Sequence, residues 1–388
     1  MDGRRQAENA QEKRGSVEGF HVARIAPSPP GFKGIYYTWA MKLLAPLLAV
    51  LLSVPAHARK HEAEEPYGVV ALFPHGLDTT TKQYLMDAAA RANRRLMRVE
   101  LPFDKIEPEE GVFQDDDLDE TVSMAAQRGI TLVGVLRGTT VWIADARSPD
   151  MRRGPVAEKK YGGYYDHAKH LAKRYQLIRY WEVWSGADDP KRFLGTPAEF
   201  AHLFEAAAKG IHSGNSDAQV LLPAPSGKVD RAFIPGSFVD QLMNDAKHPA
   251  RKRFDGIALR LRLSLDALPG VVRDAREYLD AHKREKASIW VVDLGFPASV
   301  AQQKLIDPGY ATGEGGQSAY YEKALPVLRR AGAEAVLVPL NDLPWSDKRC
   351  AGAPFPLSAC SEGLVTFPDP SSPKGSRDRA ALAVLQKL

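Results

Sequence analysis

Charged side chains on predicted strands are the residues of this sequence that could do chemistry. In the segment 259–263 every second residue is leucine, and Arg260 and Arg262 stand between the leucines. A strand places alternate residues on opposite faces, so the leucines would face outer helices and both arginines would point inward. The same parity predicts inward-pointing charges on three other strands: Arg98, Glu100, Glu182 and Asp293.

These charges allow two kinds of chemistry. Asp293 can neutralise Arg260, which would make the charges an internal ion-pair network with a purely structural role. Alternatively, surplus arginines can bind an acidic ligand, because the planar guanidinium pairs with a carboxylate through two parallel hydrogen bonds. Arg98, Glu100, Arg260 and Arg262 are therefore candidate ligand-binding residues.

The elements that must position these side chains alternate strictly between strand-like and helix-like segments. We predict eight strands, at 68–73, 96–101, 131–136, 177–184, 219–223, 256–263, 288–294 and 335–340. We predict eight helices, at 81–93, 118–128, 165–175, 197–211, 237–246, 268–283, 319–331 and 378–388. Such alternation predicts a parallel sheet, and eight repeats favour a single-domain α/β fold, the closed (β/α)8 TIM barrel, over an open doubly wound sheet. The first strand is followed by no glycine-rich phosphate loop, which disfavours a nucleotide-binding fold.

The amino-terminal residues are predicted to lie outside this fold. Residues 41–58 combine a lysine, a short apolar run and an Ala-His-Ala ending, which is the pattern of a secretory signal peptide. We interpret the polar residues 1–40 either as the result of a start codon assigned too far upstream or as a disordered leader. The apolar run is shorter than the roughly 20 residues that span a bilayer, so we expect cleavage and a periplasmic or secreted protein without stable membrane insertion. The barrel would then occupy 59–388.

Net charge and cysteine content exclude several classes of partner and cofactor. The segment 1–58 holds seven of the 52 Lys and Arg residues and four of the 48 Asp and Glu residues, so the remainder is close to neutral. Nothing in this balance indicates a nucleic-acid partner or a basic membrane-binding patch. Cys350 and Cys360 are the two cysteines, and after export they are expected to form a disulfide rather than remain free thiols. We expect no metal site and no cofactor, and we place His167 and His170 on a helix surface without an acidic partner.

Several short motifs occur in order along the predicted strands. They are Arg-Val-Glu at 98–100 with I-E-P-E-E-G-V-F at 106–113, G-T-T-V-W at 138–142, W-E-V-W at 181–184 with F-L-G-T-P at 193–197, and W-V-V-D-L-G-F at 290–296. Together they resemble the retaining glycosidases of clan A, especially the β-xylosidase and α-iduronidase branch. The resemblance covers nearly all of 59–388 and implies a carbohydrate-related function on a barrel fold.

The sequence departs from this family at its catalytic positions. The family's fourth strand ends W-E-V-W-N-E-P, and its asparagine and acid/base glutamate are replaced here by Ser185 and Gly186. Asp293 stands at the position of the nucleophilic glutamate, and Arg260 replaces a histidine. A retaining glycosidase needs two carboxyl groups about 5–5.5 Å apart, and general acid catalysis contributes about 100- to 10,000-fold in rate. We therefore predict that the usual mechanism is absent.

A relocated acid and a set of aromatic rings complete the predicted site. Asp188 or Asp189, on the loop after the fourth strand, is the candidate for a replacement acid, and the alternative is a solvated loop or helix cap. Four aromatic residues near strand ends are expected to surround the barrel mouth and stack on a sugar. With Ser185 they complete the candidate substrate-binding set: Trp142, Trp184, Phe296 and Trp345.

Three functions remain open from the sequence. We favour an exported pseudoenzyme that binds a polysaccharide or oligosaccharide, possibly acidic, in an exopolysaccharide or cell-envelope system. The second is an active glycoside hydrolase or lyase that uses Asp293 and a loop carboxylate. The third is a non-catalytic scaffold that uses the barrel to hold another protein, with the mouth filled by side chains. The carbohydrate interpretation rests on the resemblance, because fold alone does not determine function.

Overall fold

The computed structural model describes residues 66–72, 76–223, 229–343, 350, 358–367 and 372–388. The predicted leader and signal peptide, residues 1–58, lie outside these residues, and so does Trp345. Predictions that concern them remain predictions.

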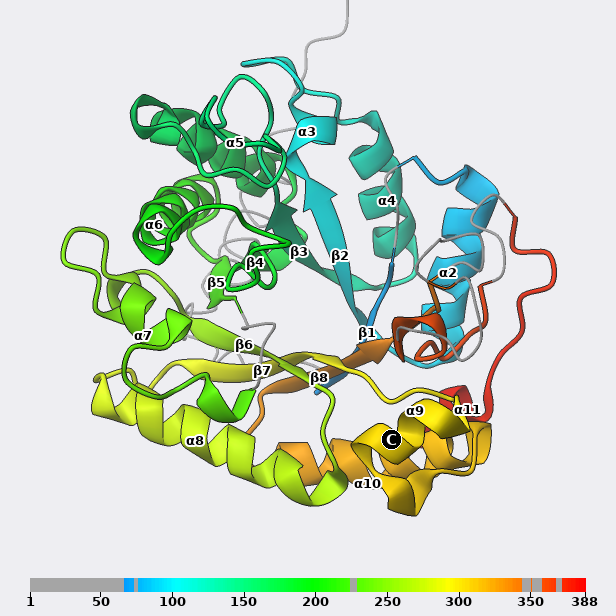
Figure 1. The fold of residues 1–388 in the computed structure, drawn as a ribbon. Coiled ribbons are helices and arrows are strands. Elements are labelled where there is room, and N and C mark those ends of the chain that lie inside the picture. Colours follow the sequence, from blue (N-terminus) through cyan, green and yellow to red (C-terminus); the bar gives the residue numbers. More distant parts are fainter. Residues whose placement is uncertain (1–65, 73–75, 224–228, 344–349, 351–357, 368–371) are drawn as a thin grey trace, which may run out of the picture. The chain divides into compact units, whose positions relative to one another are not determined.

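Eight parallel strands close into a barrel in sequence order, as predicted (Figure 1). The strands are β1 (Tyr67–Val70), β2 (Leu96–Pro102), β3 (Thr131–Arg137), β4 (Ile178–Val183), β5 (Gln219–Leu222), β6 (Gly256–Leu261), β7 (Ser288–Leu294) and β8 (Ala335–Pro339). The closing contact pairs β1 with β8, where Val69 lies opposite Val338. The (β/α)8 fold class is therefore confirmed.

Helices follow the strands and surround the barrel (Figure 1). They are α2 (Thr79–Arg91), α3 (Phe103–Ile106), α4 (Asp116–Gln127), α5 (Tyr161–Arg174), α6 (Pro197–Gly214), α7 (Phe238–Met243), α8 (Leu268–Ala281), α9 (Val300–Ile306), α10 (Glu314–Arg330) and α11 (Ala380–Lys387). Each predicted helix is present, with ends shifted by a few residues. The short helices α3 and α9, of four and seven residues, were not predicted.

Local sequence signals explain the start and the packing of α6. The Thr196 hydroxyl accepts the Glu199 N–H at 3.2 Å, and the Glu199 carboxylate accepts the Thr196 N–H at 2.7 Å. This reciprocal capping box satisfies two amide groups at the helix start, and Pro197 suits the first helical position. Further along α6, Gly210 and Gly214 lie against the backbone of α5, where a Cβ atom would collide with Tyr165 and Lys169.

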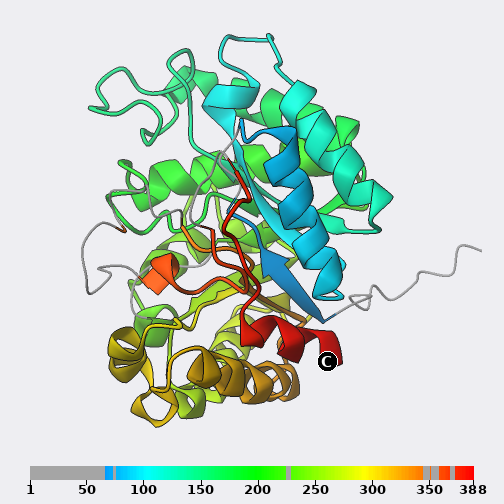
Figure 2. The same cartoon turned by 90° about the vertical axis from the view of Figure 1, so that its right-hand side faces the viewer.

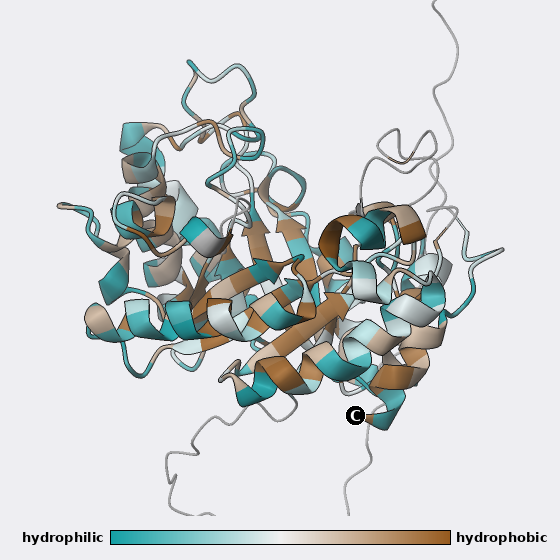
Figure 3. Cartoon of the chain, turned by 60° about the horizontal axis from the view of Figure 1, so that its bottom comes forward, coloured by the Kyte–Doolittle hydropathy of each residue, from teal (hydrophilic) through white to brown (hydrophobic). Residues whose placement is uncertain are grey.

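Two apolar cores hold the barrel together. The smaller one fills the inside with one or two residues from each strand: Val70, Leu96, Val133, Leu221, Ala258, Trp290, Val292, Ala335 and Leu337, with Tyr180 against them. The larger one lies between the strands and the helices and includes Leu259 and Leu261. The strands are accordingly hydrophobic, and the helices carry hydrophilic bands (Figure 3). On β6 the leucines therefore point outward and the residues between them point inward, as predicted.

The described residues after β8 end in α11. The Arg91 guanidinium of α2 forms an ion pair with Asp378 at 2.9 Å, so the carboxy-terminal segment runs beside α2 (Figure 2). Cys350 and Cys360 form the predicted disulfide, with a Cα–Cα distance of 5.7 Å. Among the described residues, none of the helices is both long and apolar enough to cross a membrane.

Candidate functional site

The predicted inward-pointing charges meet at the carboxyl ends of the strands. On β2, the Arg98 guanidinium contacts the Glu182 carboxylate of β4, with Nε 2.8 Å and Nη2 2.7 Å from Oε2. Both side chains are almost fully buried. Burial acts to lower the pKa of Arg98, but the carboxylates of Glu182, Glu100 and Asp293 together outweigh it, so the net pKa is raised and the guanidinium stays charged.

Asp293 binds two guanidinium groups from β6 and the residue after it. Arg260 donates from Nε and Nη2 to Oδ2 at 3.1 and 3.0 Å, and Arg262 donates from Nη2 to Oδ1 at 2.9 Å. Burial would raise the pKa of Asp293, but the charges of Arg262 and Arg260 prevail and hold it well below its usual range. Both carboxylate oxygens are thus engaged, and the group is ionised at every physiological pH.

A β-bulge brings Asp293 to this position. Leu259 pairs with Val291, but the next pair is Arg260 with Asp293, so β7 contains one extra residue. Bulges re-aim side chains near sites. In a regular strand Trp290 and Asp293, three residues apart, would lie on opposite faces. The extra residue lets both point inward.

Two further ion pairs extend the network. Arg262 also donates from Nε and Nη2 to Glu362, at 3.0 and 2.7 Å. Arg137, the last residue of β3, pairs with Glu100 of β2. Burial would raise the pKa of Glu100, but the guanidinium groups of Arg137 and Arg98 lower it. The ion-pair network predicted from the sequence is therefore present in the structure. It includes Glu100 and Glu362 as well as Asp293.

Within the described network, neither Asp293 nor Glu100 is suited to donate a proton. A catalytic acid is held neutral near pH 7 by an environment that raises its pKa. The pKa values of Asp293 and Glu100 are shifted in the opposite direction, and Oε2 of Glu182 is bound by Arg98. A nucleophilic role for Asp293 would also require it to leave both arginines.

The end of β4, where the clan A acid would lie, has an unusual backbone. Trp184 has φ of 59° and Gly186 has φ of 71°. A bulky residue at positive φ is an outlier that costs about 1–3 kcal/mol, and such strain occurs mostly at functional sites. Between them Ser185 is buried, and its Oγ has no hydrogen-bond partner within the described part of the chain.

The loop after Gly186 holds the two aspartates considered as a replacement acid. Asp189 accepts the Lys191 N–H at 2.8 Å, and its other oxygen is 3.8 Å from Nε of Arg192. These contacts are those of a turn, in line with the loop interpretation. Asp188 is half-buried beside it.

The predicted aromatic ring around the mouth was placed wrongly in part. Trp184 is 1% exposed and packs edge-on against Phe193, and Phe296 is fully buried and stacked on Tyr320. Neither ring presents a face to a ligand, because both belong to the outer core. Trp142 is half-buried and donates from Nε1 to the Glu107 carbonyl at 3.1 Å.

The histidines of α5 also differ from the prediction. His167 is buried and its Nδ1 lies 2.8 Å from the Glu107 carboxylate, while His170 contacts Asp115 at 3.0 Å. Their acidic partners come from the β2–α4 connection, about 55 to 60 residues away in sequence, so spacing within the helix could not indicate them. No group of three or more His, Cys, Asp and Glu side chains in the described ranges is arranged to hold a metal ion.

Three residues of the site were missed in the sequence. Arg137 follows the period of two from Val133 and could have been found as the last inward position of β3. Arg192 and Glu362 lie on loops, where no periodicity indicates which way a side chain points.

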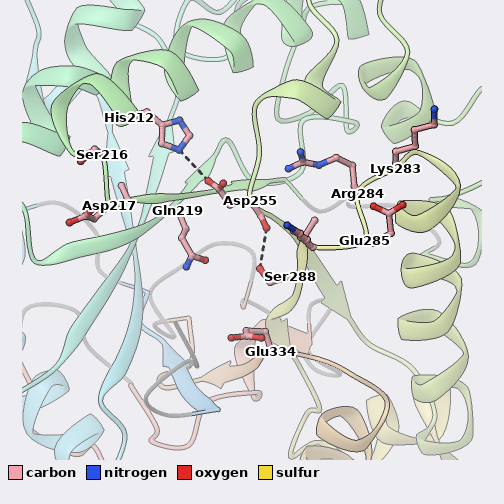
Figure 4. A pocket seen from close by; sticks show the side chains of 13 residues that line it. His212, Ser216, Asp217, Gln219, Asp255, Lys283, Arg284, Glu285, Ser288 and Glu334 are labelled. Carbon is pink, nitrogen blue, oxygen red and sulfur yellow. Dashed lines mark hydrogen bonds and ion pairs between the residues drawn. The ribbon is translucent and has the colours of Figure 1, made fainter. Parts of the chain in front are cut away.

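A separate polar hollow of about 690 Å³ lies at the opposite end of the barrel (Figure 4). It is formed near the amino ends of β5 to β8, where His212 contacts Asp255 at 3.2 Å and Glu334 and Lys286 line the wall. In TIM barrels this end contributes stability, and the chemistry lies at the other end. The candidate site is therefore the charged mouth.

The closed eight-stranded barrel has the (β/α)8 fold of solved glycoside hydrolases. Solved structures similar to the chain include a family 39 glycoside hydrolase from Bacteroides cellulosilyticus WH2, with TM-score 0.59, 15% identity and coverage of 83% of this chain and 63% of that one. A GH5_18 protein from Streptomyces cattleya in complex with GlcNAc has TM-score 0.58, 15% identity and coverage of 83% and 78%. A monomeric β-xylosidase from Caulobacter crescentus CB15 has TM-score 0.56, 15% identity and coverage of 83% and 67%.

These likenesses establish the fold and no more, because the identities are so low. The chain spans about 63% of the family 39 structure. No protein-family model matches the sequence. The curated proteins likewise contain no match to it.

Proposed function

We propose that this protein is an exported, non-catalytic carbohydrate-binding protein that holds a polysaccharide or oligosaccharide at the barrel mouth. The observation that carries the proposal is Asp293, whose two oxygens are both bound by Arg260 and Arg262. The second carboxyl group of a retaining pair is replaced by Gly186. The fold is shared with sugar-binding enzymes such as the GH5_18 protein solved with GlcNAc, which supports a carbohydrate ligand.

Export is the second part of the proposal. Residues 41–58 have the pattern of a signal peptide, and the Cys350–Cys360 disulfide suits an oxidising compartment. Amino-terminal sequencing of the protein recovered from the periplasm or medium would then begin at Arg59. Recovery of an intact amino terminus from the cytoplasm would contradict export.

The test of function measures binding and turnover in the same samples. Purified protein is mixed with neutral and uronic-acid oligosaccharides, and the melting temperature and the released reducing ends are both followed. A ligand at roughly 100 times its Kd adds about 2.7 kcal/mol, which for a domain of this size raises the melting temperature by about 4 °C. We expect such a rise without product.

The competing function is an active hydrolase with relocated catalytic groups. Release of reducing ends that Asp293→Asn abolishes would show that Asp293 still acts as a nucleophile, and the non-catalytic proposal would be wrong. Turnover that survives Asp293→Asn and disappears in Asp188→Asn would contradict it equally.

A further inference from the structure

The guanidinium groups of the mouth differ in how well they are neutralised. Arg98 is paired with Glu182, and Arg262 is held between Asp293 and Glu362 at 2.7 to 2.9 Å. Arg262 is bound by two carboxylates, and the Arg98 side chain is only 5% exposed. They serve the network and have little left to offer a ligand.

Three other arginines each pair with a single carboxylate and retain some exposure to solvent, and we name Arg137, Arg192 and Arg260 the arginine trio. Arg137 is 48% exposed, Arg192 is 36% exposed and Arg260 is 20% exposed. They come from the end of β3, the loop after β4 and the body of β6. All three can therefore be reached from the solvent side of the mouth.

Arg192 is the least compensated member of the arginine trio. Its nearest carboxylate oxygen, on Asp189, is 3.8 Å away, which is too far for a hydrogen bond. Burial lowers the pKa of Arg192, and the charges of Arg260 and Arg137 lower it further, against weaker opposing effects of Glu100 and Asp189. An anion placed among the three guanidinium groups would remove this repulsion.

A second feature at the same end of the barrel lacks a partner. Ser185 is buried at the end of β4, and neither its Oγ nor Oε1 of Glu182 has a hydrogen-bond partner among the described residues. Buried polar groups are normally satisfied by protein, water or ligand. Hydroxyl groups of a sugar can donate to one and accept from the other.

Resting on the proposed function, we propose that the arginine trio binds the anionic substituent of an acidic sugar, with Arg192 as the residue that sets this specificity. The substituent is a carboxylate or a sulfate ester, since both present oxygens that match the guanidinium fork. Sugar hydroxyl groups then lie toward Ser185 and Glu182. The ligand class is thus narrowed from carbohydrate to acidic carbohydrate.

The test compares each acidic ligand with a neutral counterpart. Oligogalacturonate and oligomannuronate are titrated into the purified protein by calorimetry, each beside its carboxyl-reduced form, and a sulfated galactan oligosaccharide forms a separate arm. The wild-type protein should bind at least one acidic ligand about tenfold or more tightly than its neutral form, the value of one charge-assisted hydrogen bond. The arm that binds distinguishes carboxylate from sulfate.

Two variants on one loop isolate Arg192. Arg192→Gln should lose about tenfold in affinity for the acidic ligand and nothing for the neutral one. Lys191→Gln removes the same charge from the neighbouring exposed residue and should change neither affinity. Because the Arg192 side chain is partly exposed and only loosely paired, its variant should melt at the wild-type temperature.

The outcomes separate the two proposals. Neutral and acidic ligands bound equally well would leave the carbohydrate proposal standing and overturn the acidic-ligand inference. An equal loss for both ligands in Arg192→Gln, or no loss for either, would also overturn it. If the wild-type protein bound none of the sugars, both proposals would be contradicted.

Discussion

The buried pair of Arg98 and Glu182 illustrates what single charges do in this barrel. Neither side chain is more than 5% exposed, so each depends on the other for compensation. Breaking a buried ion pair by removing one partner costs about 3–5 kcal/mol, whereas replacing both by apolar residues is often neutral. The pair therefore restricts which side chains the barrel interior can hold. Its presence is weak evidence that it stabilises the fold.

We expect Arg98→Met to lower the free energy of unfolding by about 3–5 kcal/mol, because it leaves the Glu182 carboxylate buried and unpaired. The double variant Arg98→Met, Glu182→Leu should recover most of this loss. Urea unfolding of both variants measures the effect. A single variant as stable as the wild type would mean that water already compensates Glu182.

How far the residues of the site could be predicted depends on where they lie. Arg98 and Arg260 stand on strands, where a period of two indicates the inward face. Asp293 was also predicted to point inward, but it does so because of the bulge in β7. Trp184 and Phe296 were misjudged because they follow the ends of regular strand, where the chain turns and parity no longer applies. Arg192 could not be found, because its position depends on a loop.

At the scale of elements, the contact between α5 and α6 depends on glycine. Gly210 faces the backbone of α5 so closely that an added Cβ atom would meet Tyr165 O. Gly162, in the first turn of α5, has open space around its Cα. The same chemical change at these two positions should therefore have opposite effects.

We expect Gly210→Ala to destabilise the protein by about 1–3 kcal/mol through overpacking. Gly162→Ala should stabilise it by about 0.4–1 kcal/mol, because alanine restricts the unfolded chain. Thermal and urea unfolding of both variants measure the difference. Stabilisation by Gly210→Ala would show that the two helices separate easily and that their close packing is not required.

Element positions were more predictable than site geometry. The eight strands follow from alternating apolar runs, and the capping box at Thr196 marks the start of α6 directly. The bulge in β7 has no such signal, because it depends on how β7 pairs with β6. One extra residue in β7, which the sequence does not signal, thus decides where Asp293 points.

At the scale of the whole molecule, carboxylates with lowered pKa values tie stability to pH. Glu205 of α6 accepts from His248 at 2.6 Å and contacts Lys209 and Arg253 at 3.0 and 3.1 Å. Burial would raise the pKa of Glu205, but the hydrogen bonds from His248 and Lys209 bring it from 4.5 to about 2. Asp293 is shifted in the same direction.

A carboxylate with a lowered pKa in the folded state stabilises the fold above its unfolded pKa, and this stability is lost as the pH falls. For Glu205 we expect the loss between pH 4.5 and about 2, amounting to at most about 3 kcal/mol. Glu205→Gln should be less stable at pH 7 and should flatten this part of the curve. Unfolding free energies measured across this range provide the test.

The exposed Glu322 of α10 provides a matched control. Glu322→Gln should leave the pH dependence of stability unchanged, since no ion pair of Glu322 is found in the described structure. If the unfolding free energy of Glu205→Gln falls at acidic pH with the same slope as in the wild type, other carboxylates control acid unfolding.

Gly186 also limits how the mouth can be redesigned. Its φ of 71° lies where a residue with a Cβ atom is strained. A glutamate placed there by a single substitution would have to adopt this conformation or move the end of β4, which is already strained at Trp184. An engineer who wished to install a proton donor would need to rebuild the turn first, so the backbone opposes the introduction of an acidic side chain at this position by a single substitution.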